Sequence, residues 1–293
     1  MISNKNDILF ILAAALLWGT TGTSQALAPA GANPVALGAL RLIIGGTALL
    51  ALALSRQSFR GILKWPILPT VVSAFFIAAY QLSFFAAVSI TGVAVGTMVA
   101  IGSSPIAAGL LGYFVRRERL DWKWLIATLF AVAGCTLLAL GGGGVKVNST
   151  GIMLALGAGF SYAAYTVSIK GLLDENGPDS VLAIVFCAAA LLLSPLLLFF
   201  GIDWVFTFKG AAVAIHLGVF ATAGAYWLFV RGLKSVKIGT AATLSLGEPL
   251  TASLLGIVVL GERLGLWQTG GIMLLFFGIA LLAFSTSGNY SEN

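Results

Sequence analysis

The sequence predicts an all-α integral membrane protein with ten transmembrane helices. Three observations support this fold class: only 9% of the 293 residues are charged, 59% are hydrophobic, and the mean hydropathy is +1.02. A soluble domain carries roughly 25% charged residues, and a chain this apolar has too little polar surface to face water. A bilayer accommodates it, because membrane helices satisfy their own backbone hydrogen bonds and expose apolar side chains to lipid.

Ten apolar stretches divide the chain, and about 20 residues in a helix cross the hydrocarbon core. We predict spans over residues 8–29, 34–55, 66–88, 92–114, 122–141, 148–170, 178–199, 209–231, 238–260 and 265–285. Every connection between spans is short, so consecutive helices are expected to run antiparallel. The chain becomes polar from Ser285 onward, which predicts a short disordered tail.

Basic residues divide unequally between the two sides of the predicted membrane, twelve against three. The richer side holds Lys5, Arg56, Arg60, Lys64, Arg116, Arg117, Arg119, Lys123, Lys170, Arg231, Lys234 and Lys237, and the other side holds Lys146, Lys209 and Arg263. Because cytoplasmic loops are rich in Lys and Arg, both termini are expected in the cytoplasm. These residues lie singly or in short runs, so the net charge of +6 is interpreted as a topology signal, and no nucleic-acid partner is expected.

The second half of the chain repeats the first at an offset of 144 residues. The matched pairs are Pro34/Pro178, Pro105/Pro249, Glu118/Glu262, Arg119/Arg263, Leu120/Leu264, Gly134/Gly278 and Trp18/Tyr162. Each half contains five predicted spans, an odd number, so the second half enters the membrane from the opposite side. We therefore predict two inverted repeats, residues 1–144 and 145–293, within one transmembrane domain. Secondary transporters use this design for alternating access, although channels also contain repeats.

The residues that match the repeat resemble the EamA type of the drug/metabolite transporter superfamily. The matching segments are Gly239–Pro249 (GTAATLSLGEP), Gly261–Leu264 (GERL), the weaker companions Ser104–Pro105 and Arg117–Leu120 (RERL), Trp18–Gly19 and Arg41. The resemblance covers nearly the whole chain. Within the superfamily the sequence looks most like the bacterial aromatic amino acid exporters of the YddG type. This resemblance implies a multi-pass carrier of the bacterial inner membrane.

Two prolines, Pro105 and Pro249, fall near the midpoints of the fourth and ninth spans, at equivalent places in the two halves. A proline removes one backbone hydrogen bond and displaces the carbonyl four residues earlier, here those of Ile101 and Ser245. Paired interruptions in two halves of a transporter point to a central site, and a simple packing kink is the alternative. We predict that both prolines act as helix breaks or hinges beside the substrate.

An acidic residue, Glu248, is the strongest site candidate because it is ionisable and lies near the bilayer midplane. A charge at that depth costs about 2.5–3.5 kcal/mol, so Glu248 is expected to face a polar cavity, bind a substrate ammonium or a proton, or pair with Arg41. The guanidinium of Arg41 is alternatively suited to a substrate carboxylate. The halves differ at this point, because Ser104 occupies the position equivalent to Glu248.

Aromatic and amide side chains supply the rest of the predicted pocket. The candidates are Trp18, Tyr80, Gln81, Tyr162, Tyr165, Tyr226 and Trp227. An aromatic stripe is more often interhelical packing, but the polar tips of Tyr and Gln need partners away from lipid. Trp18 and Tyr162 are the foremost pair because they are central and are related by the repeat. The substrate ammonium is expected at Glu248 or at the carbonyls that the prolines free.

The expected function is export of amino acids, including aromatic ones, or of similar small metabolites by alternating access. Efflux of cationic compounds by the same architecture is the nearest alternative, with Glu248 and the aromatic residues binding the cation, and a channel is a more distant one. The sequence contains no catalytic constellation and no phosphate-binding loop, so no enzyme activity, cofactor or metal is expected. The expected partners are a small-molecule substrate and the lipid bilayer, and the sequence is compatible with a monomer.

Overall fold

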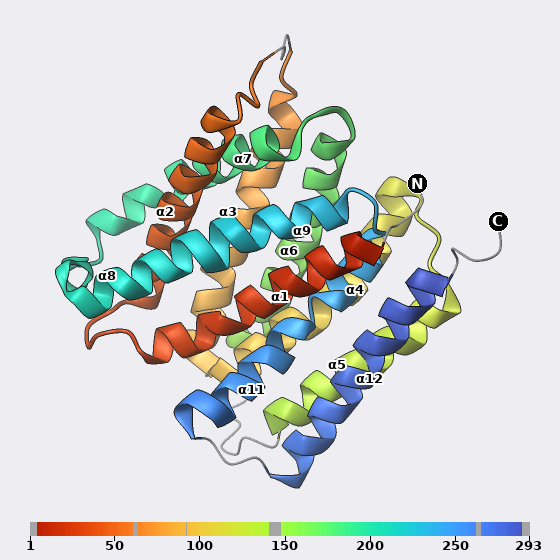
Figure 1. Ribbon diagram of the computed structural model, residues 1–293. Coiled ribbons are helices and arrows are strands. Elements are labelled where there is room, and N and C mark those ends of the chain that lie inside the picture. The colour runs from red at the N-terminus through yellow and green to blue at the C-terminus, as the bar shows by residue number, and fades with distance from the viewer. Residues whose placement is uncertain (1–4, 61–63, 92, 141–147, 262–264, 289–293) are drawn as a thin grey trace.

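The protein is described by a computed structural model, which covers residues 5–60, 64–91, 93–140, 148–261 and 265–288. Within these ranges every regular element is helical (Figure 1). The helices are α1 (Lys5–Ala26), α2 (Pro34–Ser55), α3 (Ile67–Thr91), α4 (Val93–Arg116), α5 (Trp122–Leu140), α6 (Ser149–Glu175), α7 (Pro178–Leu193), η1 (Ser194–Leu198), η2 (Asp203–Phe206), α8 (Phe208–Ile215), η3 (His216–Gly224), α9 (Ala225–Leu233), α10 (Ile238–Leu244), α11 (Gly247–Leu260) and α12 (Leu266–Gly288).

Nine segments of the described chain are long and apolar enough to cross a membrane, and Trp122–Leu138 is a shorter apolar helix. The predicted all-helical fold is therefore confirmed, and nine membrane-length segments with one shorter apolar helix correspond to the ten predicted spans. Three of the spans are composite: α7 continues into η1, α8, the π-helical η3 and α9 follow one another without a gap, and α10 is followed closely by α11. The disordered tail predicted from Ser285 onward is wrong for its first residues, because α12 continues to Gly288. The predicted motif residues 262–264 lie outside the described residues.

Side-chain caps set several helix starts, as their residue types require. Asn33 accepts hydrogen bonds from the N–H groups of Val35 and Ala36, at 2.8 and 3.3 Å, while Pro34 occupies the first helical position, where no donor is needed. Asp121 accepts a hydrogen bond from the N–H of Trp124 at 2.7 Å and so begins α5. These caps fix where the short loops turn the chain back through the membrane.

The helices of the first half pack mainly on helices of the second half. Helix α1 packs on α9 and α11, α2 on α7 and η3, α3 on α6, α4 on α6 and α10, and α5 on α12, with α5 and α12 side by side in Figure 1. At Gly19, an added Cβ would lie 2.8 Å from the carbonyl oxygen of Glu248, so only a glycine allows α1 this close to α11. The centre of the molecule is thus enclosed by helices from both halves.

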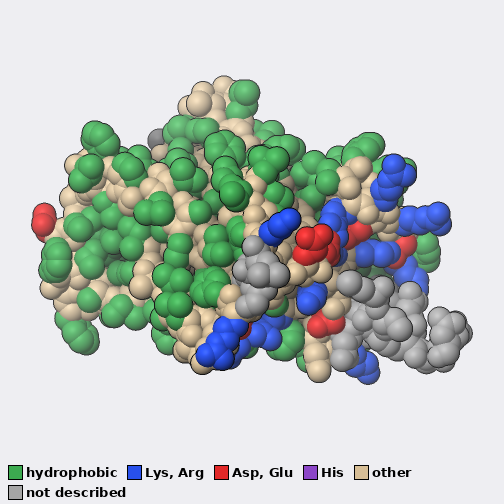
Figure 2. All heavy atoms as spheres, turned by 90° about the horizontal axis from the view of Figure 1, so that it is seen from above, with side chains coloured by type: hydrophobic (Ala, Val, Ile, Leu, Met, Phe, Trp, Pro, Cys, Tyr) green, Lys and Arg blue, Asp and Glu red, His purple; other side chains and the backbone are tan. Residues whose placement is uncertain are grey.

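The two ends of the helices differ in charge. The end that holds the first residues of α1 and the last residues of α12 is here named the terminal face; it also holds residues 56–60, 64–66, 117–121, 176–177 and 234–237. The other end, with the loops around residues 27–33 and 199–207, is named the opposite face. Figure 2 shows Lys and Arg side chains gathered at the end of the molecule where both termini lie in Figure 1.

The two central prolines affect their helices differently from the prediction. Helix α4 runs through Pro105 without interruption, because the Ser104 hydroxyl donates to the carbonyl of Ile101 at 2.8 Å and replaces the missing N–H. In the second half the helix breaks between α10 and α11, and the N–H of Glu248 donates to the carbonyl of Ser245 at 3.0 Å. Each carbonyl therefore already accepts one hydrogen bond, so neither is left without a donor by its proline.

Removing the Ser104 hydroxyl is expected to destabilise the protein. In Ser104→Ala the buried Ile101 carbonyl loses its donor, which costs about 1–3 kcal/mol, measurable as a lower thermal unfolding temperature in detergent. The matched control is Ser89→Ala, because Ser89 is exposed and donates to Ala86 in a helix turn without proline. Equal unfolding temperatures for Ser104→Ala and the wild type would contradict this role for the hydroxyl.

Candidate substrate-binding site

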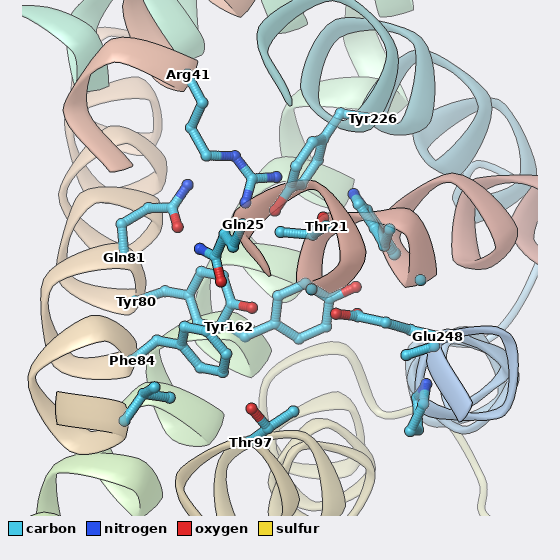
Figure 3. Close-up of a pocket in the computed structure, with 16 residues that line it drawn as sticks. Thr21, Gln25, Arg41, Tyr80, Gln81, Phe84, Thr97, Tyr162, Tyr226 and Glu248 are labelled. Carbon is cyan, nitrogen blue, oxygen red and sulfur yellow. The ribbon is translucent and has the colours of Figure 1, made fainter. Parts of the chain in front are cut away.

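A cavity of about 120 Å³ lies at the centre of the molecule, among helices of both halves (Figure 3). Its walls come from α1, α2, α3, α4, α6, α9 and α11. The lining residues are Trp18, Gly19, Thr21, Gly22, Gln25, Arg41, Tyr80, Gln81, Phe84, Val88, Thr97, Tyr162, Tyr226, Glu248, Pro249 and Ala252. A polar and aromatic surface of this kind inside an apolar bundle is the form expected of a small-molecule site.

Most residues predicted for the site meet in this cavity. The predicted residues that line it are Trp18, Arg41, Tyr80, Gln81, Tyr162, Tyr226, Glu248 and Pro249. Ser104 lies beside it, in a smaller cavity of about 20 Å³ that also contains Ser245 and shares Tyr80, Tyr162 and Glu248 with the first. Ser104 and Glu248, equivalent under the 144-residue offset, therefore line the same small cavity.

Three predicted residues line neither cavity: Pro105, Tyr165 and Trp227. Trp227 follows Tyr226 in α9 and points about 100° away from it around the helix, toward the terminal face. There its Nε1–H donates to Asp179 at 2.9 Å, and the Arg231 guanidinium stacks 4.0 Å from its ring centroid. Tyr165 is fully buried behind the wall, against Tyr162 and Tyr226. For Trp227 and Tyr165 the prediction of direct lining is wrong.

The sequence analysis missed several lining residues, notably Thr21, Gln25 and Thr97. Thr21 and Gln25 follow Trp18 at spacings of three and seven residues, which places all three on one face of α1. Helical spacing from Trp18 would have identified Thr21 and Gln25, whereas nothing in the sequence around Thr97 distinguishes it from other threonines in apolar helices. Phe84, four residues after Tyr80 in the aromatic stripe of α3, also lines the cavity.

The guanidinium of Arg41 enters the cavity from α2, with the residue only 8% exposed. Its Nε donates to the Thr222 hydroxyl at 2.9 Å, and its Nη2 donates to the Ala221 carbonyl at 3.1 Å. Thr222 in turn donates to Leu217, five residues back in the π-helical η3, a local geometry often found at functional sites. Within the described chain Nη1 has no partner, so one edge of the guanidinium remains able to bind an anion.

The carboxylate of Glu248 enters from the start of α11, on another wall of the cavity. Figure 3 shows it directed inward near Tyr162, with Arg41 reaching in from α2. Among the described residues neither carboxylate oxygen accepts a hydrogen bond, and the ion pairs do not include one between Glu248 and Arg41. The alternative of a structural Arg41–Glu248 pair is therefore not what the structure shows. The site holds opposite charges that remain apart.

Neutral polar atoms and aromatic rings complete the wall. Gln81 Oε1 and Trp18 Nε1 are buried without a hydrogen-bond partner in the described chain, and both residues line the cavity. The Trp18 ring lies 5.0 Å from that of Tyr226 and 6.2 Å from that of Tyr162, between centroids. Since unpaired buried polar atoms cost free energy, these groups are suited to bind a ligand's polar atoms beside an aromatic surface.

The cavity continues toward the opposite face. A second cavity, of about 550 Å³, shares Gly22, Gln25, Val88 and Ala252 with the first. It is lined further by residues at the end of α1, in the loop to α2 and near the ends of α2, α3 and α11, including the exposed Ala26. The two cavities are therefore neighbours with four shared wall residues, and the larger one lies toward the opposite face.

Comparison with known proteins agrees with this architecture. A model of the EamA-like transporter family matches residues 6–140 and again residues 149–284. The uncharacterized transporter YwfM of Bacillus subtilis (strain 168) is 46% identical over 276 residues, 94% of this chain and 93% of the relative. The threonine/homoserine exporter RhtA of Escherichia coli (strain K12) is 30% identical over 260 residues, 88% of this chain and 84% of the relative.

A solved crystal structure superposes with a TM-score of 0.83 at 22% identity, covering 99% of this chain and 100% of the other, which supports the fold alone. The family match, the bacterial transporter relatives and the membrane-length apolar helices identify a multi-pass transport protein of the bacterial inner membrane, not an enzyme. The chain belongs to the EamA-like transporter family.

Proposed function

We propose that the protein is a secondary carrier that exports amino acids, including aromatic ones, from the cytoplasm by alternating access. The observation that carries this proposal is the separation of charges in the central cavity. Among the described residues, Arg41 has a free guanidinium edge and Glu248 has an unpaired carboxylate, and they enter one site from different walls. A zwitterion presents the complementary pair of charges on one small molecule.

The amino acid would bind with its carboxylate at Arg41 and its ammonium at Glu248. A guanidinium edge binds a carboxylate by charge-assisted hydrogen bonds, and an unpaired charge near the midplane costs about 2.5–3.5 kcal/mol. Binding a zwitterion compensates both buried charges at once, whereas a neutral ligand compensates neither. The side chain would lie against Trp18, Tyr162 and Tyr80, with Gln81 available to a polar group.

The proposed topology places the larger cavity on the external side of the membrane, because the basic residues of the terminal face would lie in the cytoplasm. Export as the direction of transport is supported by the relative named a threonine/homoserine exporter. Two inverted repeats would let the site open to either side at a similar energy, and the two successive matches to one family model support the repeat. The relative named a threonine/homoserine exporter supports amino acids as the substrate class.

Efflux of cationic compounds is the second candidate, favoured by Glu248 and the aromatic wall. Arg41 argues against it, because a guanidinium in the same cavity repels a cation. A channel is the third candidate, and single-channel recording separates it from a carrier, since a channel passes many ions at each opening. Steady ionic currents in a protein that shows no substrate counterflow would identify a channel and refute the proposed carrier.

Substrate counterflow in proteoliposomes tests the proposal directly. Vesicles loaded with unlabelled amino acid are expected to accumulate the same labelled amino acid transiently, at equal pH on both sides. The panel contains threonine, homoserine, phenylalanine, tryptophan and a quaternary ammonium dye, each with and without a pH gradient. Accumulation of the dye but of none of the amino acids would refute amino acid export and support the second candidate.

Replacing Trp18 is expected to change the preference among amino acids. Trp18→Ala removes the largest aromatic ring from the cavity wall, so transport of phenylalanine and tryptophan should fall about tenfold relative to threonine, since aromatic contacts contribute roughly 0.5–1.5 kcal/mol beyond area burial. Relative uptake in a mixed-substrate counterflow assay measures this ratio. Trp267→Ala is the matched control because Trp267 is 70% exposed at the start of α12. An unchanged ratio would make Trp18 a packing residue.

A further inference from the structure

A buried ionic cluster closes the terminal face beneath the binding cavity. Lys170, near the end of α6, is only 7% exposed, and its Nζ donates to Glu118 Oε1 at 2.8 Å and to the Val236 carbonyl at 2.5 Å. The other oxygen, Glu118 Oε2, accepts the N–H of Ile238, the first residue of α10, at 2.6 Å. One carboxylate thus joins the α4–α5 loop to α6 and α10.

The layer between this cluster and the binding cavity is tightly packed. A Cβ added to Gly239 would lie 3.2 Å from the Cα of Gly109, so α10 and α4 touch nearly backbone to backbone. The hydroxyls of Thr128 and Thr243 form a buried hydrogen bond of 2.8 Å between α5 and α10. Ala108, one turn beyond Ser104 on the same face of α4, is completely buried. No substrate can pass through this layer while α4 and α10 stay together.

The backbone that presents Glu118 is held in an unfavourable conformation. Arg117 has a φ of +54°, which is uncommon for a residue other than glycine. The turn ends α4 and lets the N–H of Glu118 donate to Gly112 at 3.1 Å. Conformations of this kind persist where surrounding contacts compensate them and are concentrated at functional and switch regions. The contacts that compensate here are those of the Glu118 carboxylate.

The two faces of the molecule differ in this respect. Under the 144-residue offset the position equivalent to Lys170 is 170 − 144 = 26, which is Ala26. Ala26 is exposed and lines the cavity of about 550 Å³ that leads to the opposite face. On the terminal face the Lys170 ammonium joins the two halves, whereas the equivalent position on the opposite face, Ala26, has no charged group. The larger cavity lies on the face that lacks the charged residue.

We infer that Glu118, Lys170 and the start of α10 form a latch that holds the terminal face closed, and that this latch must open for substrate to load from the cytoplasm. The inference rests on the proposed alternating-access export. Separating α4 and the loop after it from both α6 and α10 would break both bonds of the Glu118 carboxylate and leave two charges unpaired until water reaches them. Neutralising either charge lowers this barrier and raises the population that is open at the terminal face.

Cysteine labelling in nanodiscs tests the latch without substrate. Both native cysteines are first removed by Cys135→Ala and Cys187→Ala. Two proteins are then made in this variant: one carries the reporter Ala108→Cys, and the other carries Thr23→Cys in the wall of the cavity of about 550 Å³. A polar maleimide reaches both faces of a nanodisc, so the result does not depend on orientation in the membrane. With the latch intact, the Thr23→Cys protein should react quickly and the Ala108→Cys protein slowly.

Glu118→Gln and Lys170→Gln are each expected to speed labelling at position 108 by at least about tenfold and to slow labelling at position 23, as a population shift requires. The matched control is Asp174→Asn, which removes the 2.6 Å pair with Arg116 between the ends of α6 and α4 but leaves α10 untouched. Unchanged labelling at position 108 in both latch variants would overturn the inference, as would equal acceleration by Asp174→Asn.

Two further comparisons separate a failed latch from a misfolded variant and from a wrong substrate. Lys170→Gln leaves the Glu118–Ile238 hydrogen bond in place, so it serves if Glu118→Gln does not fold, as judged by size-exclusion chromatography and thermal unfolding. The labelling contrast is independent of the amino acid counterflow assay. Counterflow that fails while the labelling contrast holds would refute the proposed substrate and preserve the latch, and the reverse result would refute the latch alone.

Discussion

Glu248→Gln is expected to reduce amino acid counterflow by about a hundredfold while the protein folds normally. The substitution keeps the size of the side chain but removes the charge that is proposed to bind the substrate ammonium, and a loss of about 2.7 kcal/mol corresponds to that factor. Because the Glu248 carboxylate accepts no hydrogen bond in the described chain, glutamine breaks no contact that holds the helices together. Counterflow at saturating and at low substrate would separate weaker binding from slower transport.

The matched control is Glu175→Gln, because Glu175 is an exposed acidic residue at the end of α6. The unfolding temperature of Glu248→Gln should equal or exceed that of the wild type, since a partly buried, unpaired charge is costly.

Repeating the counterflow assay with a pH gradient distinguishes binding of the substrate ammonium by Glu248 from proton transport by Glu248. If Glu248 carries a proton, the variant should lose the gradient's effect but retain exchange at equal pH. Wild-type kinetics in every arm would remove Glu248 from the mechanism.

The fold was largely predictable from the sequence because bilayer thickness sets the helix length and the apolar stretches reveal it directly. Prediction was weaker where local hydrogen bonds compensate a helix-breaking residue. Pro105 does not break α4, since the Ser104 hydroxyl replaces the missing donor, whereas Pro249 follows a genuine break between α10 and α11. The sequence shows the prolines but not which side chain will serve the released carbonyl. The sequence likewise does not show that η3 is π-helical or that Arg41 of α2 donates hydrogen bonds to two of its residues, Thr222 and Ala221.

The candidate site was predictable as far as residue chemistry identifies polar groups in apolar helices. Arg41, Glu248 and Gln81 were found this way, because each polar side chain needs a partner or a cavity inside a membrane. Side-chain direction was not predictable to one residue. Tyr226 and Trp227 are adjacent, and both are aromatic side chains with one polar group. Tyr226 lines the cavity, whereas Trp227 donates a hydrogen bond to Asp179 at the terminal face. Hydropathy does not show which face of α9 points inward.

Arg41→Gln is expected to decide between a zwitterionic and a cationic substrate. In the proposed site the variant loses the partner of the substrate carboxylate, so amino acid counterflow should fall about tenfold to a hundredfold, since hydrogen bonds to charged groups contribute about 1.5–3 kcal/mol. Amino acid amides, which keep the ammonium but lack the carboxylate, should be transported as well as before or better, because a repulsive charge has been removed. Parallel counterflow of phenylalanine and phenylalanine amide measures both effects.

Arg41 also joins α2 to η3 through Thr222 and Ala221, so a loss of transport alone would not separate substrate binding from structure. Arg41→Lys keeps the positive charge but loses the planar guanidinium, which can donate to Thr222, to Ala221 and to a substrate carboxylate at the same time. If Arg41 only holds the helices, Arg41→Gln should lower the unfolding temperature and reduce transport of acid and amide equally. If it binds the carboxylate, the acid-to-amide ratio should fall in Arg41→Gln and change less in Arg41→Lys. A ratio equal to that of the wild type in both variants would exclude contact between Arg41 and the substrate carboxylate and would leave cation efflux through Glu248 as the better account of the site.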